Sequence, residues 1–274
     1  MLNLLLNPKH KQTMKRIIIL ALLATICYTS FAQTREEFEA AIIDMNSQMP
    51  ISMGPSGEAQ SVAIEGQYVV YDIVVNDLGN TMSKGVLTPE KYKDTFLTFL
   101  PVSIMSTQYL SDFFSAMIEF NMGIIFHVTS ENTGDVISVT ISSQELNESI
   151  NSQPNFKKVL DIAVMNTKAS YPINTYGITL VDSELKNGYW VNTAIVNEAE
   201  VNFEAIQENA EQVKEQIKNM IVSATDQVFN MNLFYCCMAD YGFSYDYVGS
   251  SSNKHVLIIF TADELMEILS SIQE

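Results

Sequence analysis

The chain has 274 residues, of which 47% are apolar and 17% charged, and its formal net charge is −17 at pH 7. This apolar content excludes an intrinsically disordered chain, and the length is sufficient for two domains with separate cores. The excess of acidic side chains disfavours binding to nucleic acids and to anionic membrane surfaces, because phosphate groups would be repelled. If electrostatics selects the partners, they would be basic proteins or divalent cations.

The first 32 residues have the features of a secretory signal peptide. Met14 is followed by two basic residues, an apolar run over residues 17–26, and small side chains at Ser30 and Ala32. A basic start, an apolar core of about ten residues and small residues before the cleavage position are typical of such a leader, whereas a membrane span needs roughly twenty apolar residues. We therefore expect translation from Met14, cleavage after Ala32, and an exported, periplasmic or extracellular protein that does not span a membrane.

The exported chain begins with a predicted helix and hairpin. Thr34 and Glu37 have the spacing of a capping box, and apolar residues then recur at helical intervals up to residue 45. Two runs rich in Val, Ile and Tyr, over 60–64 and 67–76, flank a Glu-Gly pair, and this pattern predicts a hairpin.

A long helical region and a second hairpin complete the first half. Thr88-Pro89 is a typical helix start, and apolar residues keep the helical period to residue 120. Pro101 interrupts this region, so we expect a kink or two consecutive helices there. Gly123 ends the helix, and two apolar-alternating runs around a polar turn then predict strands over 124–128 and 136–141.

The second half repeats this order. A helix over 156–163 is predicted first, and strands over 178–186 and 189–196 then flank Asn187-Gly188, a strong signal for a two-residue hairpin. Apolar residues from 206 to 238 step by three and four, which predicts one long helix with a single apolar stripe. Another hairpin follows.

Two features recur at one offset of 119 residues: a glycine that ends the long helix, and a capping box after the last strand. They are Gly123 with Gly242, and Ser142-x-x-Glu145 with Thr261-x-x-Glu264. We infer duplication of one architecture. The predicted fold class is α+β, with two similar tandem units over 33–152 and 153–274 after a leader over 1–32. Each unit is expected to be a four-stranded antiparallel sheet with a long helix packed on one face and short flanking helices.

The positions shared by the halves form a recognisable pattern: an early Pro, a Tyr-containing strand, a helix-ending Gly, an aromatic strand residue, a Gly or Asn turn, an Ile/Val strand and a closing Glu-Leu. The first half supplies Pro50, Tyr68, Tyr71, Gly123, Phe126, Gly134, Ile137, Val139, Ile141, Glu145 and Leu146. The second supplies Pro172, Tyr189, Gly242, Tyr245, Asn253, Val256, Ile258, Phe260, Glu264 and Leu265, and departs at Asn192, which replaces Tyr71. This pattern resembles uncharacterised exported bacterial envelope proteins built of small α+β repeats. The resemblance implies a scaffold and carries no activity.

The exported chain would keep two cysteines, the neighbours Cys236 and Cys237. Adjacent residues form a disulfide only in a strained ring, so a disulfide framework is not expected. Two small apolar residues in a helix are the preferred interpretation, with a redox or metal role as the alternative.

Asp246 and His255 are the candidate catalytic residues. If the last hairpin folds about its Ser-rich turn, these two side chains approach each other diagonally across the strands. Such a pair could orient a base, but no nucleophile can be assigned to it, and a surface contact is the default interpretation. The chain has no His/Cys/Asp/Glu cluster with zinc spacing and no Gly-rich phosphate loop, so neither a metal nor a cofactor is predicted.

Two further groups are candidate binding residues. Glu204, Glu208 and Glu211 follow one side of the predicted long helix, either as a solvated face or as a patch for a cation or basic partner. Tyr245 and Tyr247 share a strand face and could form an aromatic platform for a glycan or peptide, although their first-half counterparts have the pattern of core residues.

These features favour a non-enzymatic binding or structural module of the bacterial envelope. Its partner would be a protein or glycan that the sequence does not identify, and nucleic acid is disfavoured. The alternatives are an inhibitor or immunity-type protein for a basic partner, and a hydrolase-like enzyme using Asp246 and His255.

Overall fold

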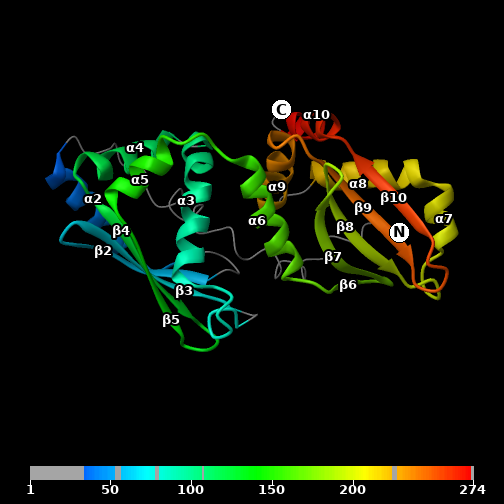
Figure 1. Ribbon diagram of the computed structural model, residues 1–274, viewed down its shortest axis with the longest axis horizontal. Coiled ribbons are helices and arrows are strands. Elements are labelled where there is room, and N and C mark those ends of the chain that lie inside the picture. Colours follow the sequence, from blue (N-terminus) through cyan, green and yellow to red (C-terminus); the bar gives the residue numbers. More distant parts are fainter. Residues whose placement is uncertain (1–33, 53–56, 78–79, 107, 224–226, 273–274) are drawn as a thin grey trace. The chain divides into compact units, whose positions relative to one another are not determined.

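The computed structural model describes residues 34–52, 57–77, 80–106, 108–223 and 227–272. These residues divide into two compact units, the first ending at Asn155 and the second beginning at Phe156 (Figure 1). The leader and its cleavage position lie outside the described residues. No helix of the described part of the chain is long and apolar enough to cross a membrane.

The first unit begins with a helix, and its two hairpin regions lie before and after a pair of helices. Its helices and strands are α2 (Arg35–Ser47), β1 (Ile51–Ser52), β2 (Gly57–Glu65), β3 (Tyr68–Val75), α3 (Pro89–Ser106), α4 (Gln108–Glu119), β4 (Gly123–Ser130), β5 (Val136–Ile141) and α5 (Ser143–Ile150).

The second unit has the same order of strands, with one more helix between its central strands. Its elements are α6 (Phe156–Lys168), β6 (Ile173–Thr175), β7 (Ile178–Lys186), β8 (Tyr189–Val196), α7 (Phe203–Glu208), α8 (Ala210–Ser223), α9 (Gln227–Met238), β9 (Gly242–Gly249), β10 (His255–Phe260) and α10 (Ala262–Ile272).

Each unit contains a five-stranded mixed sheet, in the order β1-β2-β3-β4-β5 and β10-β9-β8-β7-β6. The α+β class is confirmed, but the predicted four-stranded antiparallel sheet is wrong in both units. A short strand, β1 or β6, adds a fifth member, and β3 pairs in parallel with β4, as β8 does with β9. The strands run in the same direction because the helical segment between them returns the chain to the end at which the first strand began.

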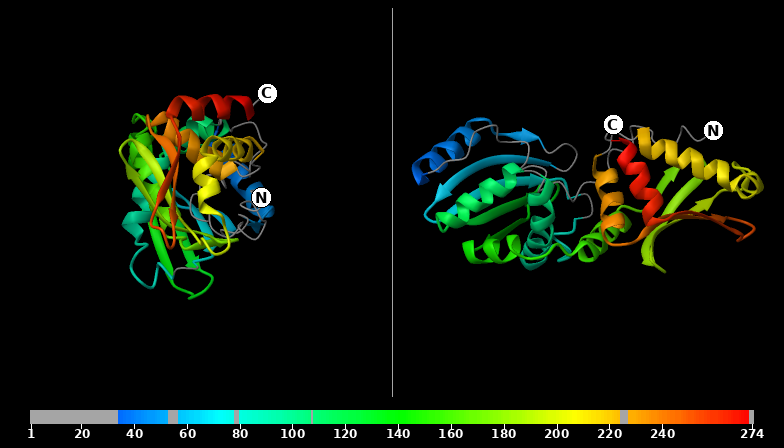
Figure 2. Two further views of the ribbon diagram at one scale, coloured as in Figure 1. Left: turned by 90° about the vertical axis from the view of Figure 1, so that its right-hand side faces the viewer. Right: turned by 90° about the horizontal axis from the view of Figure 1, so that it is seen from above.

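The helices of each unit gather on one face of its sheet (Figures 1 and 2). In the first unit Tyr71 and Phe126 point to this inner face, where both are buried and their rings stack with centroids 5.8 Å apart. Their strand neighbours Asp72 and His127 point to the outer face, which leaves Asp72 exposed and His127 partly so. The alternation along each strand therefore separates an apolar core from a polar outer face.

Local sequence signals are confirmed where they depend on neighbouring residues. The three predicted capping boxes are present, with hydrogen bonds in both directions between Ser or Thr and Glu. Asn187 and Gly188 both have positive φ, at 53° and 78°, as the predicted two-residue hairpin requires.

The predicted long helix of the second half is interrupted. Asn209 leaves helical geometry, with φ −118° and ψ 34°, and separates α7 from α8. A further boundary lies between α8 and α9. Val213, Ile217 and Ile221 are buried along α8, so the apolar stripe is real although the helix is not continuous. Because only one residue, Asn209, separates α7 from α8, the apolar residues on both sides keep their spacing of three and four. The spacing alone therefore could not reveal the interruption.

Pro101 lies inside α3, which continues to Ser106, and α4 begins at Gln108. The two consecutive helices that the sequence predicts are therefore present, but they divide beyond the proline and not at it. Proline lacks the N–H that would bond the carbonyl of Leu97, four residues earlier. Ser149 of α5 supplies the missing donor, because its hydroxyl donates to the Leu97 carbonyl at 2.8 Å. A neighbouring helix therefore compensates for the proline.

Replacing Ser149 with Ala should lower the free energy of unfolding by about 1–2 kcal/mol, because the Leu97 carbonyl would lose its donor in a partly buried place. Thr98→Ala is the matched control. The Thr98 hydroxyl bonds the Asp94 carbonyl within the same helix, where a main-chain N–H is also present, and a change below about 0.5 kcal/mol is expected. Urea unfolding followed by circular dichroism measures both, and equal losses would show that the proline is not compensated by Ser149.

Candidate functional site

Asp246 and His255 meet on the outer face of the second sheet, as the diagonal pairing predicts. His255 Nδ1 lies 2.9 and 3.0 Å from the two carboxylate oxygens of Asp246. The His255 side chain is 61% exposed, and among the described residues the pair hydrogen-bonds to no hydroxyl or thiol. The arrangement can orient an imidazole, but it brings no nucleophile to it.

The first unit carries a different polar row at the corresponding place, which sequence reasoning missed. Ser61, Asp72, His127 and Ser138 are successive register partners across four strands. Ser61 donates to Asp72 at 2.5 Å, and His127 Nδ1 lies 2.9 Å from the Ser138 hydroxyl. Only the strand register reveals this row, because its members are far apart in sequence. The carboxylate of Asp72 and the imidazole of His127 each have a serine partner. We interpret the row as a set of paired polar side chains on the solvent-facing side of the sheet.

The two cysteines are free thiols on α9. Cys236 is fully buried, and burial raises the pKa of its thiol well above the ordinary value. Cys237 is half-buried, its Sγ lies 3.6 Å from the Ala262 carbonyl, and burial raises its pKa to about 11. Both stay protonated near neutral pH, which makes them poor nucleophiles and poor metal ligands.

The glutamates predicted on one helix are divided between two. Glu204 and Glu208 are exposed on α7, whereas Glu211 is exposed on α8, beyond the interruption at Asn209. The described residues contain no group of three or more His, Cys, Asp or Glu that could hold a metal ion.

Tyr245 and Tyr247 point to the inner face of the second sheet, under the helices. Their rings stack with centroids 5.9 Å apart and an interplanar angle of 26°. Tyr247 is buried at 3% exposure, while Tyr245 is half-buried. The pair therefore forms part of the interior and reaches the surface only through Tyr245.

An amide lies beside these rings, because Asn192 is the register partner of Tyr245 on the adjacent strand. Its Oδ1 accepts hydrogen bonds from the Tyr171 hydroxyl at 2.7 Å and the Ser183 hydroxyl at 3.0 Å. Ser183 in turn accepts from Trp190 Nε1 at 2.6 Å. Asn192 is only 4% exposed. We call this set the tyrosine–amide cluster: Tyr171, Ser183, Trp190, Asn192, Tyr245 and Tyr247.

The tyrosine–amide cluster is polar but uncharged. Burial raises the pKa of Tyr245 to about 12, and it raises the pKa values of Tyr171 and Tyr247 further above the ordinary value of a phenol. All three hydroxyls therefore remain protonated and can donate as well as accept hydrogen bonds.

The matching positions of the first unit are mainly apolar. At the offsets of the shared pattern, Val62, Tyr71, Phe126 and Val128 correspond to Ser183, Asn192, Tyr245 and Tyr247.

The helix layer also covers the two central aromatic residues differently. Phe126 is 1% exposed, and the rings of Tyr92 and Phe96 from α3 lie 5.6 and 5.1 Å away. Tyr245 has ring contacts within the described residues only to Phe243 and Tyr247 of its own strand. The second unit thus leaves its central aromatic ring partly open where the first unit closes it.

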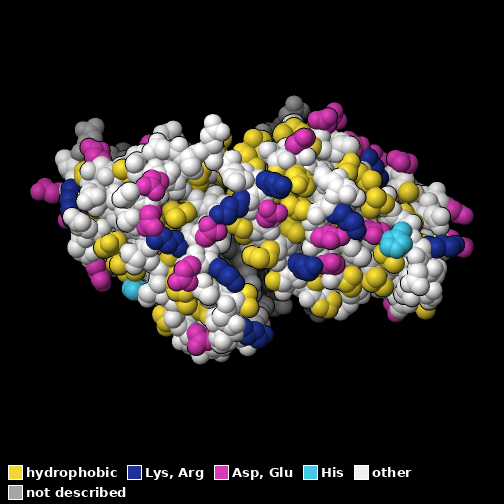
Figure 3. All heavy atoms as spheres, in the orientation of Figure 1, with side chains coloured by type: hydrophobic (Ala, Val, Ile, Leu, Met, Phe, Trp, Pro, Cys, Tyr) yellow, Lys and Arg dark blue, Asp and Glu magenta, His cyan; other side chains and the backbone are white. Residues whose placement is uncertain are grey.

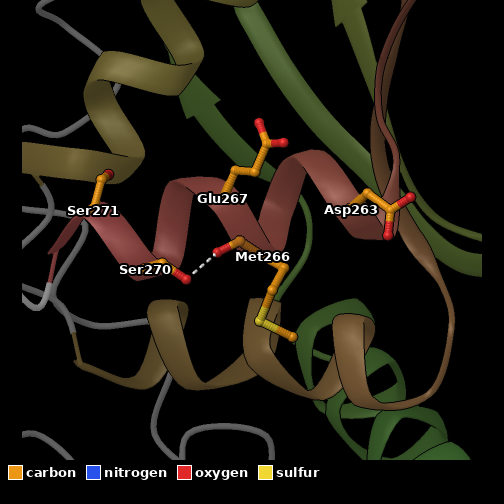
Figure 4. A pocket seen from close by; sticks show the side chains of 5 residues that line it. All are labelled: Asp263, Met266, Glu267, Ser270 and Ser271. Atoms are coloured by element: carbon orange, nitrogen blue, oxygen red, sulfur yellow. Dashed lines mark hydrogen bonds between the residues drawn. The ribbon is translucent and has the colours of Figure 1, made fainter.

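A shallow surface hollow lies along α10, lined by Asp263, Met266, Glu267, Ser270 and Ser271 (Figure 4). The Ser270 hydroxyl donates to the main-chain carbonyl of Met266 at 2.8 Å, so this serine is engaged within its own helix. The Ser271 hydroxyl likewise donates to the Ile268 carbonyl at 2.6 Å. The other three side chains offer two carboxylates and one thioether to solvent. This hollow was not anticipated from the sequence, because its residues are those of an ordinary amphipathic helix.

No protein-family model matches the chain, and no curated protein matches it. Among solved structures, a Pseudomonas aeruginosa protein described as a "putative secreted protein (PA3611)" is similar over 40% of this chain and 92% of its own. The sequence identity is 15% and the TM-score is 0.33. A likeness at this level carries no functional argument.

Proposed function

We propose that this chain is an exported, non-enzymatic binding protein whose second unit holds an uncharged, hydroxyl-bearing ligand at the tyrosine–amide cluster. The observation that carries the proposal is the polar character of this place in the second sheet. The nearly buried Asn192 amide, 4% exposed, accepts hydrogen bonds from Tyr171 and Ser183 beside the half-buried Tyr245. The first unit has Val62, Tyr71 and Phe126 at the positions of Ser183, Asn192 and Tyr245.

The chemistry of the cluster favours a neutral saccharide. Its groups are phenol hydroxyls, an amide and aromatic rings, which can bond sugar hydroxyls and pack against the apolar face of a sugar ring. Tyr171 and Tyr245 are the half-buried members, and Tyr245 would be the point of contact from the surface. The net charge of −17 would repel anionic ligands, which further favours a neutral one. Export, on which access to extracellular glycans depends, rests on the leader over residues 1–32.

Trp190 makes this proposal directly testable, because it is the only tryptophan of the chain and belongs to the cluster. A panel of neutral cello-, malto-, xylo- and chito-oligosaccharides should contain at least one that changes Trp190 emission and raises the melting temperature, as expected when a ligand binds only the folded state. Tyr245→Phe should weaken that binding about tenfold, which corresponds to roughly one lost hydrogen bond of about 1.4 kcal/mol.

Tyr71→Phe is the matched control, since Tyr71 occupies the position of Asn192 in the first unit and its hydroxyl lies 3.9 Å from Met45 Sδ, away from the proposed saccharide site. Its affinity for the same sugar should equal that of the wild type. A panel without any response, or equal weakening by both variants, would contradict a saccharide site at the cluster.

A further inference from the structure

Helix α9 exposes an apolar face, of which one member, Phe234, also packs edge-on against Phe156 of α6 with ring centroids 6.4 Å apart. Met231, Phe234 and Met238 are 38%, 38% and 40% exposed and lie three and four residues apart, so they share one side of the helix. The opposite side, with Leu233 and Cys236, is buried. The helix is therefore apolar on both sides, whereas a helix at the surface of a domain ordinarily presents polar residues to solvent.

Helix α10 packs against α9 and carries an exposed methionine beside acidic side chains. Met266 is 40% exposed, and Figure 4 shows its side chain pointing toward α9, whereas Glu267 points away from that helix. Asp263 and Glu267 line the same hollow as Met266, and no basic side chain lines it. We call Met231, Phe234, Met238 and Met266 together the methionine face.

The composition of this surface indicates the kind of occupant that it fits. Methionine side chains are unbranched and polarizable, so they adapt to apolar groups of different shapes. An apolar surface with carboxylates at its border complements a helix that has one apolar face and basic residues beside it. The charge of −17 would attract the same occupant over a longer range.

We propose that the methionine face is the docking surface for a basic amphipathic helix of a partner protein. The apolar face of the partner helix would lie on Met231, Phe234, Met238 and Met266, and its lysines or arginines would pair with Asp263 and Glu267. This inference is independent of the saccharide site, because the two surfaces share no residue.

The test uses a labelled helical peptide of about 14 leucine and lysine residues in amphipathic order, with the dissociation constant measured by fluorescence anisotropy at physiological salt. The wild-type chain should bind this peptide more tightly than a peptide of the same composition in scrambled order. Met231→Gln combined with Met238→Gln, which keeps side-chain length while removing apolar character, should weaken binding about tenfold. Glu267→Lys should weaken it about fivefold and reduce its salt dependence.

Two matched variants distinguish binding at the methionine face from non-specific attraction of the peptide by the negative charge of the chain. Glu208→Lys makes the same change in net charge on α7, and Met105→Gln removes an exposed methionine of α3 that is 66% accessible. Both should leave the dissociation constant unchanged. Equal weakening by Glu208→Lys and Glu267→Lys, or equal affinity for the scrambled peptide, would overturn the proposal. All substituted side chains are exposed. An unchanged Trp190 emission spectrum verifies that the variants of the second unit are folded, and an unchanged circular dichroism spectrum verifies this for Met105→Gln in the first unit.

Discussion

Phe126→Ala is expected to lower the free energy of unfolding of the first unit by about 3–5 kcal/mol. Phe126 is 1% exposed and lies within 6 Å of the rings of Tyr71, Tyr92 and Phe96, which come from both the sheet and α3. Truncation would remove apolar burial and leave a cavity between these two layers, which cannot collapse fully. Urea unfolding followed by circular dichroism measures the loss.

Trp190 provides the control for this prediction, because it lies in the second unit and its emission reports unfolding there. The Phe126 variant should shift the circular dichroism transition and leave the Trp190 transition in place. At the matched position of the second unit, Tyr245→Phe should change stability by less than about 1 kcal/mol, since it removes only a hydroxyl without a described partner. A loss below about 1 kcal/mol for Phe126→Ala would show that this ring does not join the layers.

Gly242→Ala is expected to destabilise the second unit by about 1–3 kcal/mol. Gly242 begins β9, and a Cβ there would overlap the ring of Tyr189 and lie 2.5 Å from the carbonyl oxygen of Phe260. The two neighbours come from the strands on either side, so relief of the overlap requires the sheet itself to shift. The Trp190 transition measures the effect, because the ring of Phe243, the next residue, lies 5.8 Å from that of Trp190.

Gly123 offers the same experiment in the first unit, where an added Cβ would contact the Ile141 carbonyl and the ring of Tyr68. Gly66→Ala is the comparison, because nothing lies within 4 Å of a Cβ at that hairpin turn. Its expected loss, about 1 kcal/mol, comes only from the positive φ of 64°. If Gly242→Ala behaved like Gly66→Ala or better, close strand approach would not explain the glycine shared by both halves.

The elements that could be predicted from the sequence depend on short-range chemistry. Capping boxes and the Asn187-Gly188 turn involve residues that are adjacent or three apart, so their geometry follows from local preferences. The approach of Asp246 and His255 also followed, because one hairpin fixes its own register. Strand direction was different. The alternation of apolar residues is the same in parallel and antiparallel strands, so the parallel pairs at the centre of each sheet could not be read from it.

The candidate site could be predicted only in part, because some of its contacts join residues that are distant in the sequence. The departure at Asn192 stood out against Tyr71, and the pair Tyr245 and Tyr247 was apparent as a strand face. The bond between Ser183 and Asn192 follows from the predicted hairpin, because the turn at Asn187-Gly188 makes these residues register partners. The bond from Tyr171, which lies before β6, to Asn192 is encoded by no spacing along the chain. The compensation of Pro101 by Ser149 is a contact of this kind as well.

The position of β5 and β10 at the edges of their sheets affects how the protein can self-associate. Each sheet ends in a six-residue strand, β5 or β10, whose outer main-chain groups pair with no described strand. Neither β5 nor β10 contains a proline, a lysine or an acidic residue, and Val136 and Leu257 are 59% and 52% exposed. A sheet edge of this kind can serve as a template onto which another extended chain adds. In concentrated solution, growth of one molecule onto the next would therefore start at residues 136–141 or 255–260, and a lysine placed in each strand would oppose it.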